Sequence, residues 1–159
     1  MVKNRPFGHN REKANSMKIH TDPARYFTKS ARNAVPIVAV SPEQLKAKKG
    51  GLEKAVRDWV ATVGFEAGKG QHCLVPDAKG GIAKVLFGLG KSGDDANPLG
   101  IGVLARSLPA GNYKFEDGGS ELAELGWAMG GYSFDRYRNG PKQTPRLVTK
   151  ETPELQRLT

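Results

Sequence analysis

Two short apolar runs on either side of a glycine-containing turn constrain the fold of this chain more than any other feature. They span residues 72–76 and 82–87, and both have the length of a buried strand. Between them stands Asp-Ala-Lys-Gly-Gly, at residues 77–81, a sequence typical of a hairpin loop. A hairpin makes its two strands antiparallel, so a sheet that contains them has at least one antiparallel pair.

A strand and two helices are predicted before this hairpin. Residues 36–40 form an apolar run of strand length, and residues 41–44, Ser-Pro-Glu-Gln, supply the cap and first turn of a helix. Residues 52–63 predict a second helix, which Gly64 is expected to end. Its apolar face consists of side chains at three- and four-residue steps: Leu52, Val56, Trp59, Val60 and Val63.

The C-terminal half continues the alternation of helices and strands. Residues 98–107 predict a helix, residues 113–115 a short strand, and Ser120 caps a longer helix. Leu122, Leu125, Met129 and Tyr132 give one apolar stripe on that helix, and Trp127, Phe134 and Tyr137 fill adjacent positions. The pair at residues 130–131, Gly-Gly, marks a kink or a close packing contact. With a last strand at residues 146–148, the order predicts an α/β fold with a mixed β-sheet flanked by helices.

Positive charge is concentrated at the N-terminus. The 159 residues suit one domain and carry a net charge of +9. Residues 1–35 hold eight Lys or Arg against Glu12 and Asp22, a balance of +6, which leaves +3 for the remainder. We expect a basic, largely irregular, solvated arm rather than a nucleic-acid-binding segment. Residues 1–16, which precede Met17, are interpreted as an upstream extension without a structural role.

Cysteine and hydropathy exclude several classes of protein. Cys73 is the only cysteine, so an intrachain disulfide and a cysteine-based zinc site are excluded. It lies in an apolar run and is predicted to be a small buried side chain rather than a reactive thiol, and a reducing compartment is compatible with this. The sequence has no run of 18 apolar residues, so we expect no membrane span.

A glycine-rich loop follows the second hairpin strand. Gly88 to Gly93 spells G-x-G-x-x-G, the pattern of a dinucleotide-binding turn. Asp94 and Asp95 come next and would repel a phosphate, and Pro98 interrupts the chain before a helix can form. Nucleotide binding by this loop is therefore the less favoured hypothesis.

Reactive side chains do not form a recognisable site. The carboxylate pairs 94–95 and 116–117 lack a third ligand at metal-binding spacing, and His72 stands alone. His9 and His20 lie in the arm. We therefore predict no catalytic, cofactor-binding or metal-binding residue in this chain.

Three segments together resemble a known enzyme family. They are L-V-P-D-A-K-G-G-I-A-K-V-L-F-G-L-G at 74–90, S-L-P-A-G-N-Y at 107–113 and E-L-G-W-A-M-G-G-Y-S-F-D-R-Y at 124–137. In this order they resemble the N-terminal region of the leucyl aminopeptidases, also called cytosol aminopeptidases. The resemblance covers residues 36–150 and implies an N-terminal α/β domain related in fold to macro domains.

The resemblance also implies a larger enzyme. Family members have a C-terminal catalytic domain that binds two divalent metals (zinc, manganese or magnesium), and they assemble as cytoplasmic hexamers. This sequence contains no N-T-D-A-x-G-R segment, which belongs to that catalytic domain. Residues 151–159 are interpreted as the start of a linker to a missing catalytic domain, which is the expected partner.

The expected function is thus that of a non-catalytic N-terminal domain. The aromatic residues expected in its core or docking surface are Trp59, Trp127, Tyr132, Phe134 and Tyr137. The alternative is a macro-like module that binds a small ligand or nucleotide through the Gly88–Gly93 loop.

Overall fold

The computed structural model describes residues 25–47, 52–91, 97–135 and 144–149, with the backbone alone at 133–135. The strands are β1 (Phe27–Thr28), β2 (Val35–Val40), β3 (His72–Pro76), β4 (Ile82–Gly88), β5 (Gly111–Phe115) and β6 (Pro145–Val148). The helices are α1 (Pro42–Lys46), α2 (Lys54–Thr62), the 3-10 helix η2 (Pro98–Ile101), α3 (Gly102–Ser107) and α4 (Glu121–Asp135). The predicted alternation of strands and helices is therefore confirmed.

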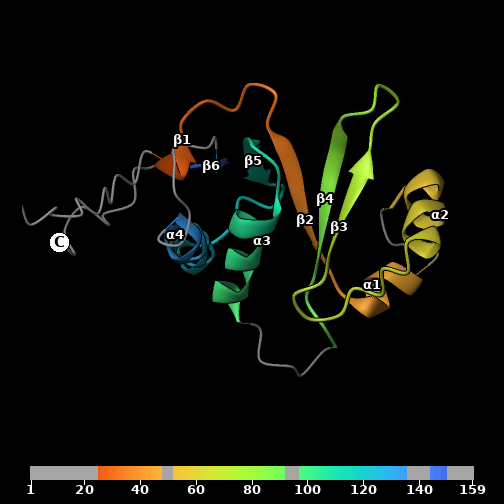
Figure 1. The fold of residues 1–159 in the computed structure, drawn as a ribbon. Coiled ribbons are helices and arrows are strands. Elements are labelled where there is room, and N and C mark those ends of the chain that lie inside the picture. Colours follow the sequence, from red (N-terminus) through yellow and green to blue (C-terminus); the bar gives the residue numbers. More distant parts are fainter. Residues whose placement is uncertain (1–24, 48–51, 92–96, 136–143, 150–159) are drawn as a thin grey trace, which may run out of the picture.

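Six strands form one mixed sheet in the order β1-β6-β5-β2-β4-β3 (Figure 1). Neighbouring strands are parallel except β3 and β4, which pair antiparallel as the hairpin predicted. The Asp77 carboxylate closes the turn by accepting hydrogen bonds from the N–H groups of Lys79 and Gly81, both at 2.7 Å. The predicted α/β class with a mixed sheet is confirmed.

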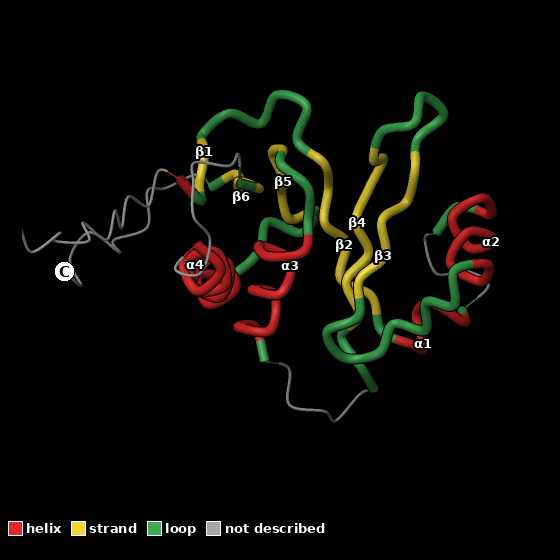
Figure 2. The backbone as a smooth tube through the Cα atoms, viewed as in Figure 1, coloured by secondary structure: helices red, strands yellow, loops and turns green. Residues whose placement is uncertain are grey.

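Helices cover the sheet on opposite faces, with α1 and α2 on one side and α3 and α4 on the other (Figure 2). The side chains of β4 alternate between the two resulting cores. Val85 and Phe87 belong to the core under α3 and α4, whereas Leu86 belongs to the core under α2. Because successive strand residues point to opposite faces, one apolar strand serves two layers.

The amphipathic helix predicted at 52–63 is α2. Only part of its predicted apolar face is buried. Val56 and Val60 are buried against β3 and β4, and Leu52 packs beside them. Trp59 and Val63 remain 37% and 47% exposed, so the predicted apolar face is wider than the buried one. Gly64 follows the helix with a φ of +70°, a conformation that glycine adopts without strain.

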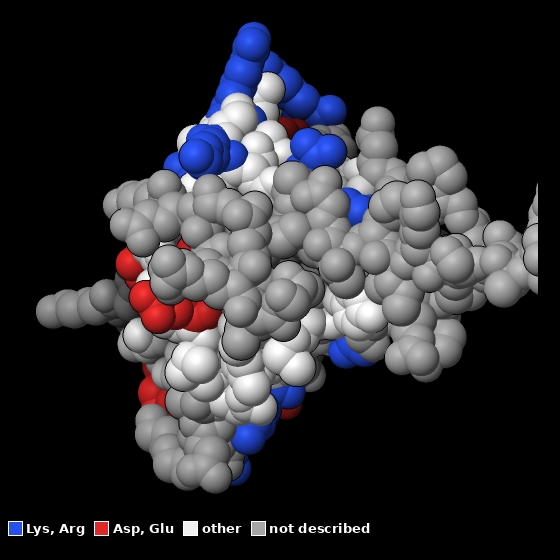
Figure 3. All heavy atoms as spheres, turned by 90° about the vertical axis from the view of Figure 1, so that its left-hand side faces the viewer, with Lys and Arg blue, Asp and Glu red and all other residues white. Residues whose placement is uncertain are grey.

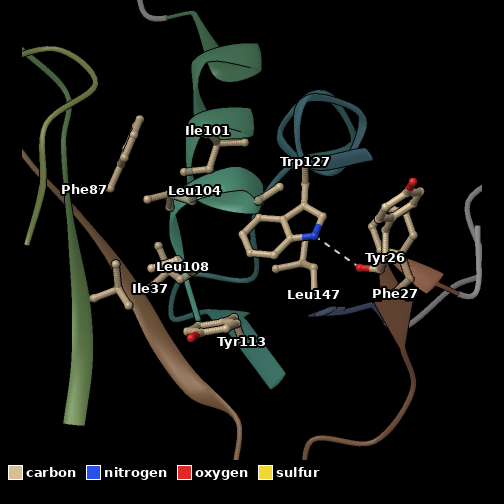
Figure 4. Packing of buried hydrophobic residues seen from close by; sticks show 12 residues of the cluster. Tyr26, Phe27, Ile37, Phe87, Ile101, Leu104, Leu108, Tyr113, Trp127 and Leu147 are labelled. Carbon is tan, nitrogen blue, oxygen red and sulfur yellow. Dashed lines mark hydrogen bonds between the residues drawn. The ribbon is translucent and has the colours of Figure 1, made fainter. Parts of the chain in front are cut away.

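The larger core is centred on Trp127, which has no exposed surface (Figure 4). Its indole Nε1 donates a hydrogen bond of 3.2 Å to the carbonyl oxygen of Tyr26. The N–H of Leu147 donates to the same oxygen at 2.8 Å. Trp127 thus ties α4 to the residue before β1, whose carbonyl also bonds β6, and its ring lies 6.2 Å from that of Tyr113.

The prediction that residues 1–35 form a largely irregular arm is wrong at its C-terminal end. Phe27 and Thr28 form β1, which pairs with Leu147 and Val148 of β6. Tyr26 and Phe27 are buried in the Trp127 core. Local periodicity could not indicate this strand, because its two residues gain partners only from the other end of the chain. Residues 1–24 lie outside the described part.

The apolar stripe predicted on α4 packs against the core only in part. Leu122 and Met129 are 54% and 56% exposed, while Trp127 is buried and Ala123 packs beside it. Tyr132 does pack against this core. The side chain of Phe134 and all of Tyr137 lie outside the described residues.

Glycines explain which face of α4 packs against its neighbours. A Cβ on Gly126 would lie 2.7 Å from the Cα of Leu99 in η2, and one on Gly130 would overlap the carbonyl of Gly102 in α3. A Cβ on Gly131 would lie 2.6 Å from the Tyr26 ring. The face of α4 that packs is therefore its glycine face, and the predicted close packing contact at 130–131 is confirmed.

The substitution Gly130→Ala tests this contact. The added methyl would force α3 and α4 apart, and we expect the free energy of unfolding to fall by about 1–3 kcal/mol, as overpacking does elsewhere. Urea denaturation followed by tryptophan fluorescence measures it. Gly100→Ala is the matched control, because a Cβ there meets nothing within 4 Å. Equal stability of the two variants would show that the backbones of α3 and α4 do not pack in direct contact at Gly130.

Alkaline pH offers a second test of the core. The Tyr113 hydroxyl donates to the carbonyl of Pro109 at 2.8 Å, and burial raises its pKa from 10.0 to about 12. Below pH 10 both folded and unfolded chains keep this proton. Between pH 10 and about 12 the unfolded chain loses it first, so the free energy of unfolding falls as pH rises.

We expect the variant Tyr113→Phe to lose this part of the pH dependence. Stability is measured by urea titration at about pH 9 and about pH 11. The fall between the two should be smaller in the variant than in the original chain by about 1–2 kcal/mol. Identical slopes would mean that Tyr113 ionises equally well in the folded state.

Candidate functional site

One hollow of the described structure lies where three parallel strands end. It has a volume of about 360 Å³ and is lined by Ala39 of β2, Gly88 of β4 and Phe115 of β5, among others. The chain leaves β2 toward α1 and leaves β4 toward α3, on opposite faces of the sheet (Figure 1). Open α/β sheets bind ligands in the crevice that such a divergence creates. We call this feature the carboxyl-edge hollow.

The walls of the carboxyl-edge hollow are mainly apolar. Phe87, Ile101 and Phe115 line it together with Leu89, which is 42% exposed. Lys69 and Asp117 are the charged side chains in the lining. Sequence reasoning did not predict this hollow. The signal that could have found it is the parallel order of β5, β2 and β4, which only the sheet topology supplies.

Polar side chains at the rim serve the local backbone. The Asn97 side chain accepts a hydrogen bond from the N–H of Leu99, and the Ser120 hydroxyl accepts one from Ala123 at the start of α4. Asp117 accepts one from the N–H of Gly119. Throughout the described residues, every buried side-chain nitrogen or oxygen has a hydrogen-bond partner. The hollow therefore holds no buried polar side chain aimed at a missing ligand.

The described part of the Gly88–Gly93 loop has a structural role. The N–H of Gly88 donates to the Gln71 carbonyl at 2.7 Å, and that of Gly90 donates to the Ala67 carbonyl at 3.0 Å. The N–H of Leu89 donates to the Val40 carbonyl at 2.9 Å. Three amides that a phosphate-binding loop would present to its ligand are thus already engaged. Ser92 and Gly93 lie outside the described residues.

A second hollow, of about 550 Å³, is lined by basic side chains. Lys46, Arg57, Lys69 and Lys91 contribute to it, beside the carboxylate of Glu66. These cations come from α1, α2 and the loops on either side of the β3–β4 hairpin. Their side chains extend from short helices and loops. In the described part of the chain, every buried side-chain nitrogen or oxygen has a hydrogen-bond partner, so no buried polar group points to a ligand here.

His72 and Cys73 line a third hollow, of about 390 Å³. Cys73 is free and buried, as predicted. Burial raises its pKa, and the nearby indole N–H of Trp59, which donates to the Leu74 carbonyl at 3.0 Å, partly offsets that rise. A buried thiol with a raised pKa has little of the thiolate that nucleophilic chemistry needs.

Metal-ligating side chains do not converge within the described ranges. No group of three or more His, Cys, Asp or Glu residues there could hold a metal ion. Asp94, Asp95, His9 and His20 lie outside those ranges. Among the helices that the structure describes, none is long and apolar enough to cross a membrane.

The fold is that of an α/β domain with a hollow at the carboxyl edge of its sheet. Comparison with known proteins identifies the family of this domain. Residues 35–150 match the family model of the M17 aminopeptidase N-terminal domain. The chain therefore belongs to the leucyl aminopeptidase family, as its N-terminal domain. The resemblance recognised in the sequence is confirmed.

A solved structure supports the same assignment. The chain is similar to the crystal structure of cytosol aminopeptidase from Coxiella burnetii, with 26% identity and a TM-score of 0.63. The similarity covers 77% of this chain and 28% of that one, so the chain spans less than a third of its relative. A search of curated proteins found no match. The assignment does not favour the alternative of a nucleotide-binding module.

Thiol labelling tests the burial of Cys73. We expect a maleimide to react with the folded chain at least about tenfold more slowly than with the chain in urea, because the thiol is both covered and protonated. Stopped-flow absorbance or mass spectrometry measures the two rates at equal pH. Rapid labelling of the folded chain would show that Cys73 is accessible.

Proposed function

We propose that this chain is the non-catalytic N-terminal domain of a leucyl-aminopeptidase-type metallopeptidase. The observation that carries the proposal is the family match over residues 35–150, which belongs to the N-terminal domain. No residue of this chain is assigned a catalytic, cofactor-binding or metal-binding role.

In this proposal the chemistry belongs to the C-terminal catalytic domain. That domain would bind two divalent metals, zinc, manganese or magnesium, which activate a water to attack the first peptide bond of a substrate. The N-terminal domain folds by itself, docks on the catalytic domain and supports contacts in a cytoplasmic hexamer. Its independent folding is favoured by the two closed cores on either side of its sheet.

The proposal predicts that the 159-residue chain releases no amino acid from an aminoacyl amide. We expect no turnover of leucine amide above the buffer rate, with or without added manganese or zinc. Ammonia release or chromatography measures it, and an intact cytosol aminopeptidase serves as the positive control. Turnover that persists at constant specific activity through a second purification would overturn the proposal.

A further inference from the structure

Large apolar side chains remain exposed around the carboxyl-edge hollow. Leu89 lines it, and Leu99, which is 39% exposed, stands between lining residues of η2. Leu122 is 54% exposed and lies in the first turn of α4, next to the lining residue Ala123. Met129 continues the same stripe two turns further along α4. We call these four exposed residues the apolar rim.

The chemistry of the hollow and its rim suits an apolar polypeptide surface. Phe87, Ile101 and Phe115 provide apolar walls, while the rim polar groups are engaged in helix caps and turns. A ligand that needs strong hydrogen bonds would find few free partners here. Exposed apolar side chains beside an apolar hollow are typical of an interaction site.

Acidic side chains flank the apolar rim. Glu116 and Asp117 lie in the segment that joins β5 to α4, Glu121 begins α4, and Asp117 lines the hollow. Figure 3, which faces the α4 side, shows several acidic side chains close together beside uncharged surface, with further acidic atoms elsewhere on this face. A partner with an apolar segment bordered by Lys or Arg would complement this arrangement.

The direction of β6 favours the following part of the polypeptide as the occupant. β6 runs parallel to β5, so the two strands end at the same edge of the sheet. That edge carries the hollow, and neighbouring strands are separated by only about 4.8 Å. The polypeptide therefore leaves Thr149 within a few strand spacings of the apolar rim. A domain attached there would face this surface at high effective concentration.

We propose that the carboxyl-edge hollow and its apolar rim dock the catalytic domain that follows this domain in the aminopeptidase polypeptide. The inference rests on the proposed function and adds the surface through which it acts. More than two thirds of the similar Coxiella burnetii chain lies beyond the matched part, which leaves ample polypeptide to cover the rim. The docking segment is apolar and bordered by basic residues.

Cysteine accessibility tests this surface without disturbing the fold. The variant Leu122→Cys places a thiol on the apolar rim, and Val63→Cys places one on α2, where Val63 is 47% exposed and outside the rim. Each variant is labelled with a maleimide in the 159-residue chain and in the full-length aminopeptidase polypeptide that carries this domain. Replacing Cys73 by serine in all samples removes the native thiol of this domain, and peptide mass spectrometry follows the label at the introduced cysteine alone.

We expect Leu122→Cys to react at least about tenfold more slowly in the full-length polypeptide than in the 159-residue chain. Val63→Cys should react at the same rate in both. Equal rates for Leu122→Cys would overturn the docking surface. Protection that is lost when an oligomer dissociates, or that rises with concentration of the 159-residue chain, would place another copy on the rim and would also overturn it.

Aminopeptidase activity of the same full-length sample separates the two proposals. An active polypeptide with unprotected Leu122→Cys leaves the proposed function intact and rejects the docking surface. Hydrolysis of leucine amide by the 159-residue chain alone would reject the proposed function, and with it the assignment of the rim to a separate catalytic domain.

Discussion

The close contact of α4 with η2 and α3 is the interaction on which the C-terminal half of this domain depends. Gly126 and Gly130 allow the helix backbones to approach to a distance that any side chain would prevent. This approach places Trp127 where its indole N–H reaches the carbonyl of Tyr26. The same carbonyl receives the N–H of Leu147, so helix packing and the pairing of β1 with β6 are coupled through one oxygen.

The sheet topology determines where the carboxyl-edge hollow lies. Connections from β2 and β4 lead to helices on opposite faces, and their divergence leaves a hollow at the carboxyl edge. The glycine face of α4 turns inward against α3, so Leu122 and Met129 are left outside. The contact that completes the core therefore also creates the apolar rim.

The glycines at the end of β4 have a structural role that bears on the nucleotide-binding hypothesis. A Cβ on Gly88 would overlap the backbone of Gly68, and its N–H is bonded to Gln71. The G-x-G part of the loop thus fastens the segment before β3 to the end of β4. A pattern that resembles a nucleotide-binding turn in sequence is, over Gly88–Lys91, a backbone contact. This agrees with the assignment to the aminopeptidase N-terminal domain family.

Local sequence determined the hairpin, the capping box at Ser41, the α/β class and the family, because each depends on residues that are close together or in a fixed order. Tertiary structure alone decided three features: the strand at Phe27, the inward face of α4 and the hollow. Hydrophobic periodicity assumes that the most apolar stripe is buried. In α4 the tightest contact is made by residues without side chains, which that measure cannot detect, and the strand and hollow require partners distant in sequence.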